Sequence, residues 1–225
     1  MPAPTAPATA LATATPTIGA RTSDTGEEQE DPAISNRPAG GNPGAGKGTA
    51  PAGPSFFAIA TQAASVVYVI DHSASMGLHG SFEIAKRELL ASLERLPAHT
   101  RFQVIVYNRT AEPVHLDSGA ALAPASPDNK QRVATFLEAL RAEGGTDHAN
   151  ALKRALTLQP EVIFFLTDAD DLKLAQIQAV THINRGRTII HTVELSSGIQ
   201  TRDDSSLEML ARANRGVCRF VTVPR

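Results

Sequence analysis

From residue 55 onward, strand-like and helix-like patterns alternate along the chain, and this alternation restricts the fold more than any other feature. Four runs rich in β-branched and aromatic residues are apolar over most of their length: Ser65–Ile70, Arg101–Tyr107, Glu161–Thr167 and Thr188–Glu194. Strands that are apolar on both faces are typical of parallel sheets covered by helices on each side. The pattern therefore predicts an α/β domain with a doubly wound, mostly parallel central sheet and helices on both faces.

The stretches between these strands carry apolar residues at spacings of three and four, as amphipathic helices do. The expected helices are Ser81–Leu96, Pro127–Leu140, Asp147–Leu158, Leu172–Asn184 and Ser205–Ala213. Ser126 before Pro127, and Asp147 at the start of its own segment, are typical helix-capping residues. The remaining expected elements are an apolar run at Ser55–Ala60, an edge strand at Glu112–Leu116, a loop at Ala120–Pro127 and a last strand at Gly216–Val223.

Residues 1–54 differ in composition from the rest of the chain. They hold nine of the fifteen prolines and only three sizeable aliphatic side chains, Leu11, Ile18 and Ile34. Such a segment cannot bury enough apolar surface to offset the entropy lost on ordering. We therefore expect a disordered linker over 1–54 and one domain over 55–225. The first twenty residues lack the basic and apolar regions of a signal peptide, and the sequence leaves the compartment undetermined. The length of the linker favours a tether to an upstream anchor or domain of a larger parent protein.

Composition excludes several classes of protein. The single cysteine, Cys218, can form neither an internal disulfide nor a Cys-based zinc cluster. The formal charge is −2 and no segment concentrates Lys and Arg, so we expect no nucleic-acid partner. The longest apolar runs, such as Val66–Ile70 and Val162–Leu166, are far shorter than the roughly 18 residues that span a bilayer. We therefore expect no direct membrane insertion by this chain.

Polar oxygen-bearing residues follow two of the predicted strands and one Gly-rich loop. Asp71, Ser73 and Ser75 come at the end of the first long strand, Asp168 follows Glu161–Thr167, and Thr146 follows Gly-Gly ahead of a helix. The carboxyl ends of parallel strands lie at one edge of a sheet, so these side chains are expected to converge. Hard oxygen donors with few carboxylates suit Mg²⁺ or Mn²⁺.

This pattern resembles the metal-ion-dependent adhesion site of von Willebrand factor type A domains. The resemblance covers roughly residues 55–223, through Asp-His-Ser-Ala-Ser at 71–75, Gly-Gly-Thr-Asp at 144–147 and Phe-Leu-Thr-Asp at 165–168. It implies a non-enzymatic protein-binding module that holds one Mg²⁺, or Mn²⁺, and uses it to bind an acidic side chain of a partner protein. In the family, Ser73 and Ser75 would ligate the metal directly, and Asp71, Thr146 and Asp168 directly or through water.

Several residues near the predicted site have no assigned role from the sequence. Many family members have Gly after the last metal-binding Asp, whereas here Ala169 is followed by Asp170 and Asp171, which either enrich cations or repel an acidic partner. Three histidines also fall on nearby loops: His72, His79 and His148. We expect them to shape the rim of the partner surface, with a zinc cluster as the alternative.

Two other functions compete with the binding module. The first is a Mg²⁺-dependent phosphohydrolase resembling the haloacid dehalogenase superfamily, with Asp71 as the nucleophile. That family has a second Asp two residues after the nucleophile, where this chain has Ser73, and a Lys for which Lys173 is the nearby candidate. The second is a scaffold that meets its partner through a helix face and keeps only a vestigial metal site.

Overall fold

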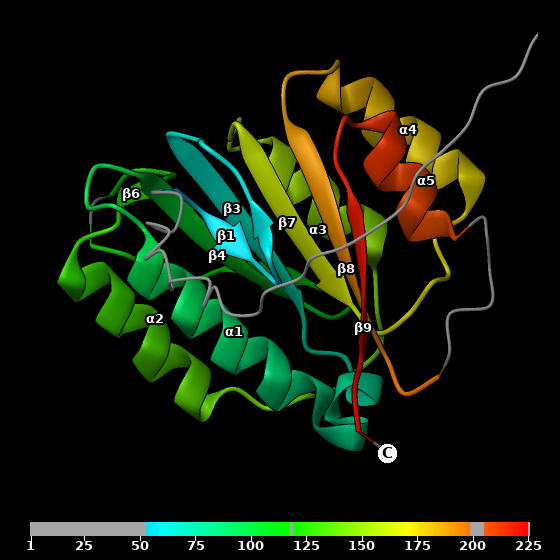
Figure 1. The fold of residues 1–225 in the computed structure, drawn as a ribbon, viewed down its shortest axis with the longest axis horizontal. Helices are drawn as coiled ribbons and strands as arrows, with labels where there is room; N and C mark the ends of the chain where they lie inside the picture. Colours follow the sequence, from blue (N-terminus) through cyan, green and yellow to red (C-terminus); the bar gives the residue numbers. More distant parts are fainter. Residues whose placement is uncertain (1–52, 118, 199–204, 225) are drawn as a thin grey trace, which may run out of the picture. The chain divides into compact units, whose positions relative to one another are not determined.

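The central sheet is built on four parallel strand pairings. The computed structural model describes residues 53–117, 119–198 and 205–224. The sheet has the order β5-β4-β3-β7-β8-β9, and β3 pairs with β4 and β7, β7 with β8, and β8 with β9, all in parallel (Figure 1). These strands are β3 (Ser65–Asp71), β4 (Arg101–Tyr107), β7 (Val162–Thr167), β8 (Ile189–Ser196) and β9 (Cys218–Thr222). The predicted α/β fold with a mostly parallel sheet is confirmed.

Two short strands pair with β4 in the antiparallel sense. They are β5 (Ala111–Pro113) and β6 (Ala123–Pro124). β5 ends at Pro113, earlier than the predicted edge strand Glu112–Leu116, although the Val114 N–H still donates to the Val104 carbonyl at 2.8 Å. The predicted loop Ala120–Pro127 is wrong at β6, because two of its residues pair with the first two residues of β4.

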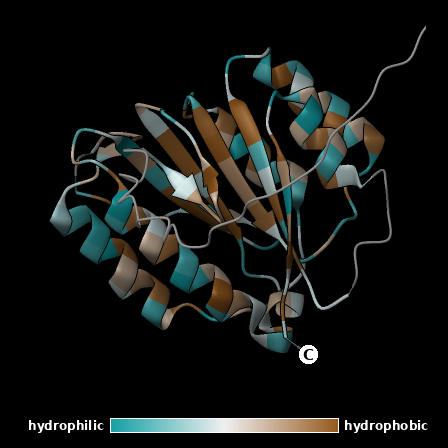
Figure 2. Ribbon diagram, in the orientation of Figure 1, coloured by the Kyte–Doolittle hydropathy of each residue, from teal (hydrophilic) through white to brown (hydrophobic). Residues whose placement is uncertain are grey.

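Helices cover both faces of the sheet. α1 (Ser81–Arg95) and α2 (Pro127–Ala139) pack on one face, where they meet Val66, Tyr68 and Ile70. α3 (His148–Leu156), α4 (Leu174–Asn184) and α5 (Ser206–Ala213) pack on the other, where they meet Val67 and Val69. Alternate residues of β3 thus enter two separate cores, which explains why the strand is apolar between its polar end residues, Ser65 and Asp71 (Figure 2).

A small hairpin precedes the sheet. β1 (Ser55–Phe56) and β2 (Ile59–Ala60) pair with each other, and the Phe56 ring packs edge-on against Tyr68 in the core. This accounts for the apolar run predicted at Ser55–Ala60. The predicted linker lies outside the described residues except for Gly53 and Pro54.

Helix boundaries follow local capping chemistry. The Ser126 hydroxyl accepts the Asn129 N–H ahead of Pro127, and the Asp147 carboxylate accepts the Asn150 N–H. α3 ends at Leu156, two residues earlier than predicted, and α4 begins at Leu174 rather than Leu172. Among the described residues, no helix is both long and apolar enough to cross a membrane.

Candidate metal centre

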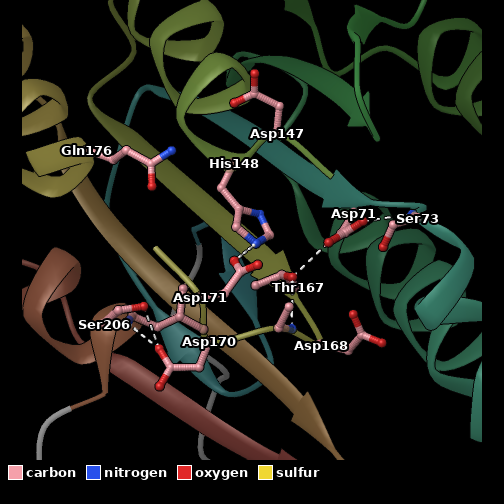
Figure 3. A network of polar contacts seen from close by, with 12 residues as sticks. Asp71, Ser73, Asp147, His148, Thr167, Asp168, Asp170, Asp171, Gln176 and Ser206 are labelled. Atoms are coloured by element: carbon pink, nitrogen blue, oxygen red, sulfur yellow. Dashed lines mark hydrogen bonds and ion pairs between the residues drawn. The ribbon is translucent and has the colours of Figure 1, made fainter. Parts of the chain in front are cut away.

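The two carboxylates of the predicted site lie at the ends of neighbouring strands. β3 and β7 run in parallel with Ile70 opposite Leu166, so Asp71 at the end of β3 lies beside Thr167 at the end of β7. Asp168 follows immediately (Figure 3). The strand register alone therefore brings Asp71 and Asp168 to one edge of the sheet, as expected from the sequence.

Asp71 is completely buried and held at both oxygens. Its Oδ1 accepts the Ser73 N–H at 2.7 Å, and its Oδ2 accepts the Thr167 hydroxyl at 2.7 Å. Thr167 was not among the residues predicted from the sequence. Its position directly before Asp168, on a strand parallel to β3, was the available signal. A carboxylate buried and occupied in this way is poorly placed to act as a nucleophile on a substrate.

Ser73, Ser75 and Asp168 form a chain of short oxygen–oxygen contacts. The Ser73 and Ser75 hydroxyl oxygens are 3.1 Å apart, and the Ser75 hydroxyl donates to Asp168 Oδ1 at 2.9 Å. Ser75 faces this way because the backbone turns after Ser73 into a 3₁₀ segment, η1 (Ala74–Gly80). Adjacent ligands of octahedral Mg²⁺, at about 2.1 Å from the ion, are about 3 Å from each other. The observed separations fit that spacing.

Asp168 is a half-buried carboxyl with a raised pKa. Burial is the main cause, and the nearby charge of Asp71 adds to it, while the hydrogen bond from Ser75 acts in the opposite direction. Burial disfavours the ionised form of a carboxyl. A cation among these oxygens would favour that form and lower the pKa again.

Thr146 lies on a loop that is fastened to the Asp-His-Ser-Ala-Ser segment. The Glu143 N–H donates to the His72 carbonyl at 2.7 Å, and the Ala74 N–H donates to the Gly144 carbonyl at 3.0 Å. Gly144 has a φ of +80°, a conformation that glycine adopts readily. The structure thus links Asp71, Ser73, Ser75 and Asp168 by hydrogen bonds and places half-buried Thr146 on the adjoining loop.

The expectation that the three histidines lie on the rim is wrong for two of them. His72 and His148 are buried, whereas His79 is exposed. The His72 Nδ1–H donates to the Arg141 carbonyl at 3.2 Å, and the His148 ring packs edge-on against Tyr107. Within the described residues, no three His, Cys, Asp or Glu side chains are grouped closely enough to hold a metal ion, which contradicts the zinc-cluster alternative.

The two extra carboxylates bind protein groups. Asp170 Oδ1 accepts the Ser206 hydroxyl at 2.5 Å and the Leu207 N–H at 3.2 Å, at the start of α5. Asp171 Oδ1 lies 2.8 Å from His148 Nε2. Figure 3 shows these two side chains directed away from Asp168. The three carboxylates of the loop after β7, those of Asp168, Asp170 and Asp171, therefore contact three different elements: η1, α5 and α3.

Comparison with known proteins places the chain in a family. The sequence model of the von Willebrand factor type A (VWA) domain matches residues 64–220. The chain belongs to the VWA family. None of the curated proteins compared with it matches.

Solved structures share the VWA fold at low sequence identity. A von Willebrand factor type A protein from Catenulispora acidiphila is 20% identical with a TM-score of 0.61, over 70% of this chain and 38% of that one. The conserved hypothetical protein BatB from Bacteroides thetaiotaomicron is 14% identical with a TM-score of 0.56, over 70% of this chain and 90% of that one.

A third similar structure contains a metal. Proximal thread matrix protein 1 from the mussel byssus, described with a zinc-occupied metal-ion-dependent adhesion site, is 13% identical with a TM-score of 0.53. The similarity covers 70% of this chain and 43% of that one. VWA domains are typically interaction modules and generally non-catalytic, and no enzyme family is indicated for this chain.

Proposed function

We propose that this VWA domain is a divalent-cation-dependent protein-binding module. Its Mg²⁺, or Mn²⁺, would be held by Asp71, Ser73, Ser75, Thr146 and Asp168, and an acidic side chain of a partner protein would complete the coordination of the ion. The ion supplies a Lewis-acidic position that attracts an anionic oxygen.

The observation that carries this proposal is the spacing of the oxygens. The Ser73–Ser75 contact of 3.1 Å and the Ser75–Asp168 contact of 2.9 Å match the edges of an octahedron around Mg²⁺. The hydrogen bonds from Ser73 and Thr167 keep Asp71 in place without an ion. These donors are all oxygen, which favours Mg²⁺ or Mn²⁺ over softer metals.

The charge of the site supports an acidic ligand from outside. Asp71 and Asp168 together balance a divalent ion, and the remaining proposed ligands are neutral hydroxyls. Asp170 and Asp171 bind the start of α5 and His148. The chain's own ligands therefore do not give the site an excess of negative charge that would repel a carboxylate from another protein.

The proposal is tested by isothermal calorimetry of the full chain with Mg²⁺ and Mn²⁺. We expect binding of about one ion per chain, lost in Asp168→Asn. Asp117→Asn is the matched control, because Asp117 is an exposed carboxylate paired with Arg132 near the opposite end of β4. That control should bind the ion like the wild type.

The partner's role is tested by repeating the Mg²⁺ titration with acetate, the smallest model of an acidic side chain. Acetate should tighten apparent Mg²⁺ binding in the wild type and have no effect in Asp168→Asn. A folded wild-type chain that takes up neither ion, with or without acetate, would contradict the cation mechanism and favour the scaffold alternative.

A further inference from the structure

Two buried side chains and one exposed carboxylate form a chain of contacts beside the candidate metal centre. The Tyr107 hydroxyl lies 2.9 Å from His148 Nδ1. His148 Nε2 lies 2.8 Å from Asp171 Oδ1 (Figure 3). Tyr107 is fully buried and His148 is 5% exposed, whereas the Asp171 side chain is 71% exposed. The contact between His148 and Asp171 is close but lacks hydrogen-bond geometry, so the buried His148 Nε2 has no hydrogen-bond partner among the described residues.

The two ring nitrogens of His148 face different partners. A carboxylate only accepts hydrogen bonds, so a hydrogen bond to Asp171 needs a proton on Nε2, and the Tyr107 hydroxyl is the group that faces Nδ1. Phe165 also packs edge-on against the His148 ring, which restricts its rotation. The ring is therefore held by contacts on both nitrogens and on its face.

His148 contacts, or lies next to, the three segments that carry the proposed metal ligands. Tyr107 is paired with Asp71 in the β3–β4 register, and burial followed by the charge of Asp71 raises the pKa of Tyr107 well above its usual range. Asp171 is three residues after Asp168 on the loop that follows β7. His148 itself is two residues after Thr146.

We propose that His148 is a positioning residue for the metal centre, acting through Tyr107 and Asp171 to hold the Asp168 loop in register with Asp71 and Thr146. This inference rests on the proposed function. Within the described contacts, the Asp168 carboxylate is joined to the rest of the site by the Ser75 hydroxyl. The contact between Asp171 and His148 connects the same loop to α3, in addition to the hydrogen bonds between Asp170 and the start of α5.

The first test removes the exposed Asp171 carboxylate, and with it the contact with His148, in the full chain. Asp171→Ala should weaken Mg²⁺ binding about tenfold or more, as loss of groups that orient metal ligands commonly does. Its thermal midpoint should change little, because the side chain is mostly in solvent. Asp171→Asn keeps an acceptor oxygen for His148 and should restore most of the affinity. A purely structural role would shift the midpoint and leave the Mg²⁺ affinity unchanged.

A double-mutant cycle identifies His148 as the partner. His148→Phe keeps a ring of similar size against Tyr107 and Phe165 but loses both nitrogens. If the two residues act through one contact, His148→Phe combined with Asp171→Ala should bind Mg²⁺ no more weakly than His148→Phe alone. Asp117→Ala, which removes a carboxylate remote from the site, should bind Mg²⁺ like the wild type.

A second measurement separates failure of this inference from failure of the proposed function. Hydrogen exchange of the amides of residues 169–173, in chelator, should be faster in Asp171→Ala than in the wild type. Equal Mg²⁺ affinities of wild type and Asp171→Ala would overturn the positioning role and leave the metal site intact. A wild type without Mg²⁺ binding would overturn the proposed function, and unchanged exchange in Asp171→Ala would then overturn the positioning role as well.

Discussion

Replacing Thr167 by Val should destabilise the metal-free domain through the buried Asp71 carboxylate. The Thr167 hydroxyl donates to Asp71 Oδ2 at 2.7 Å, and both side chains are fully buried. Val has nearly the same shape but no hydroxyl, so Asp71 Oδ2 loses this donor where water cannot replace it. Because the acceptor is a charged group, the free energy lost with this hydrogen bond is larger than for a hydrogen bond between neutral groups.

The magnitude follows from the charge of the acceptor. A hydrogen bond to a charged group contributes about 1.5–3 kcal/mol, and one between neutral groups about 1 kcal/mol. Thr192 provides the comparison, because it is equally buried and its hydroxyl donates to the neutral Leu207 carbonyl at 3.1 Å. The Thr167 hydroxyl also accepts the Ala169 N–H at 3.1 Å, and the loss of that bond adds to the cost of Thr167→Val. Thr167→Val should therefore cost about twice as much free energy of unfolding as Thr192→Val.

The assay is urea unfolding of both variants in chelator, so that no bound cation compensates Asp71. A loss of about 2 kcal/mol in a domain of this size also lowers the thermal midpoint by about 4–8 °C. Equal losses in the two variants, or a smaller loss for Thr167→Val, would show that the hydrogen bond to Asp71 is not a principal support of the site.

Two further predictions concern the β8–β9 region. Gly216→Ala should lower the free energy of unfolding in urea by about 2–3 kcal/mol, because a Cβ there overlaps the Ile190 carbonyl. Gly198→Ala is the control and should be close to neutral, because its Cβ would lie 3.5 Å from the nearest atom. Similar stabilities of the two variants would contradict this packing. Burial lowers the pKa of His191, and its Nδ1 accepts the Val217 N–H at 3.1 Å. The unfolded chain then binds the proton more readily, so the free energy of unfolding should fall as the pH drops from the ordinary histidine pKa of about 6.5 toward the lowered value. His191→Phe should flatten that dependence in urea unfolding at pH 7.5, 6.5 and 5.5, and an unchanged slope would assign it to other groups.

The positions of Asp71 and Asp168 could be predicted because they depend only on strand order and direction. Each carboxylate comes at the carboxyl end of an apolar strand, and parallel neighbouring strands end at the same edge. The Gly-Gly break before Thr146 marked a loop at that edge in the same way. Whether Thr146 completes the coordination of an ion stays a proposal.

The histidines show where the sequence pattern was misleading. His72 and His148 lie in loop or helix-start positions that usually face solvent, and a polar residue there predicts a surface role. Each is instead buried against an aromatic ring, Phe82 for His72 and Tyr107 for His148. Nothing in their spacing along the chain indicates these contacts, because the rings come from other elements.

The alternation of buried strands and amphipathic helices can be predicted from the sequence, and with it the sheet edge where the acidic and hydroxyl residues gather. These are local properties, set by side-chain periodicity and by the turn and capping residues. The partners of the site's side chains, in contrast, are set by the three-dimensional arrangement of the elements. The Thr167 hydroxyl meets Asp71 across 96 positions of sequence, and neighbouring Asp170 and Asp171 diverge to Ser206 and His148. Such pairings depend on strand register and on the path of each loop in space. Residue type and spacing along the chain do not indicate either of these.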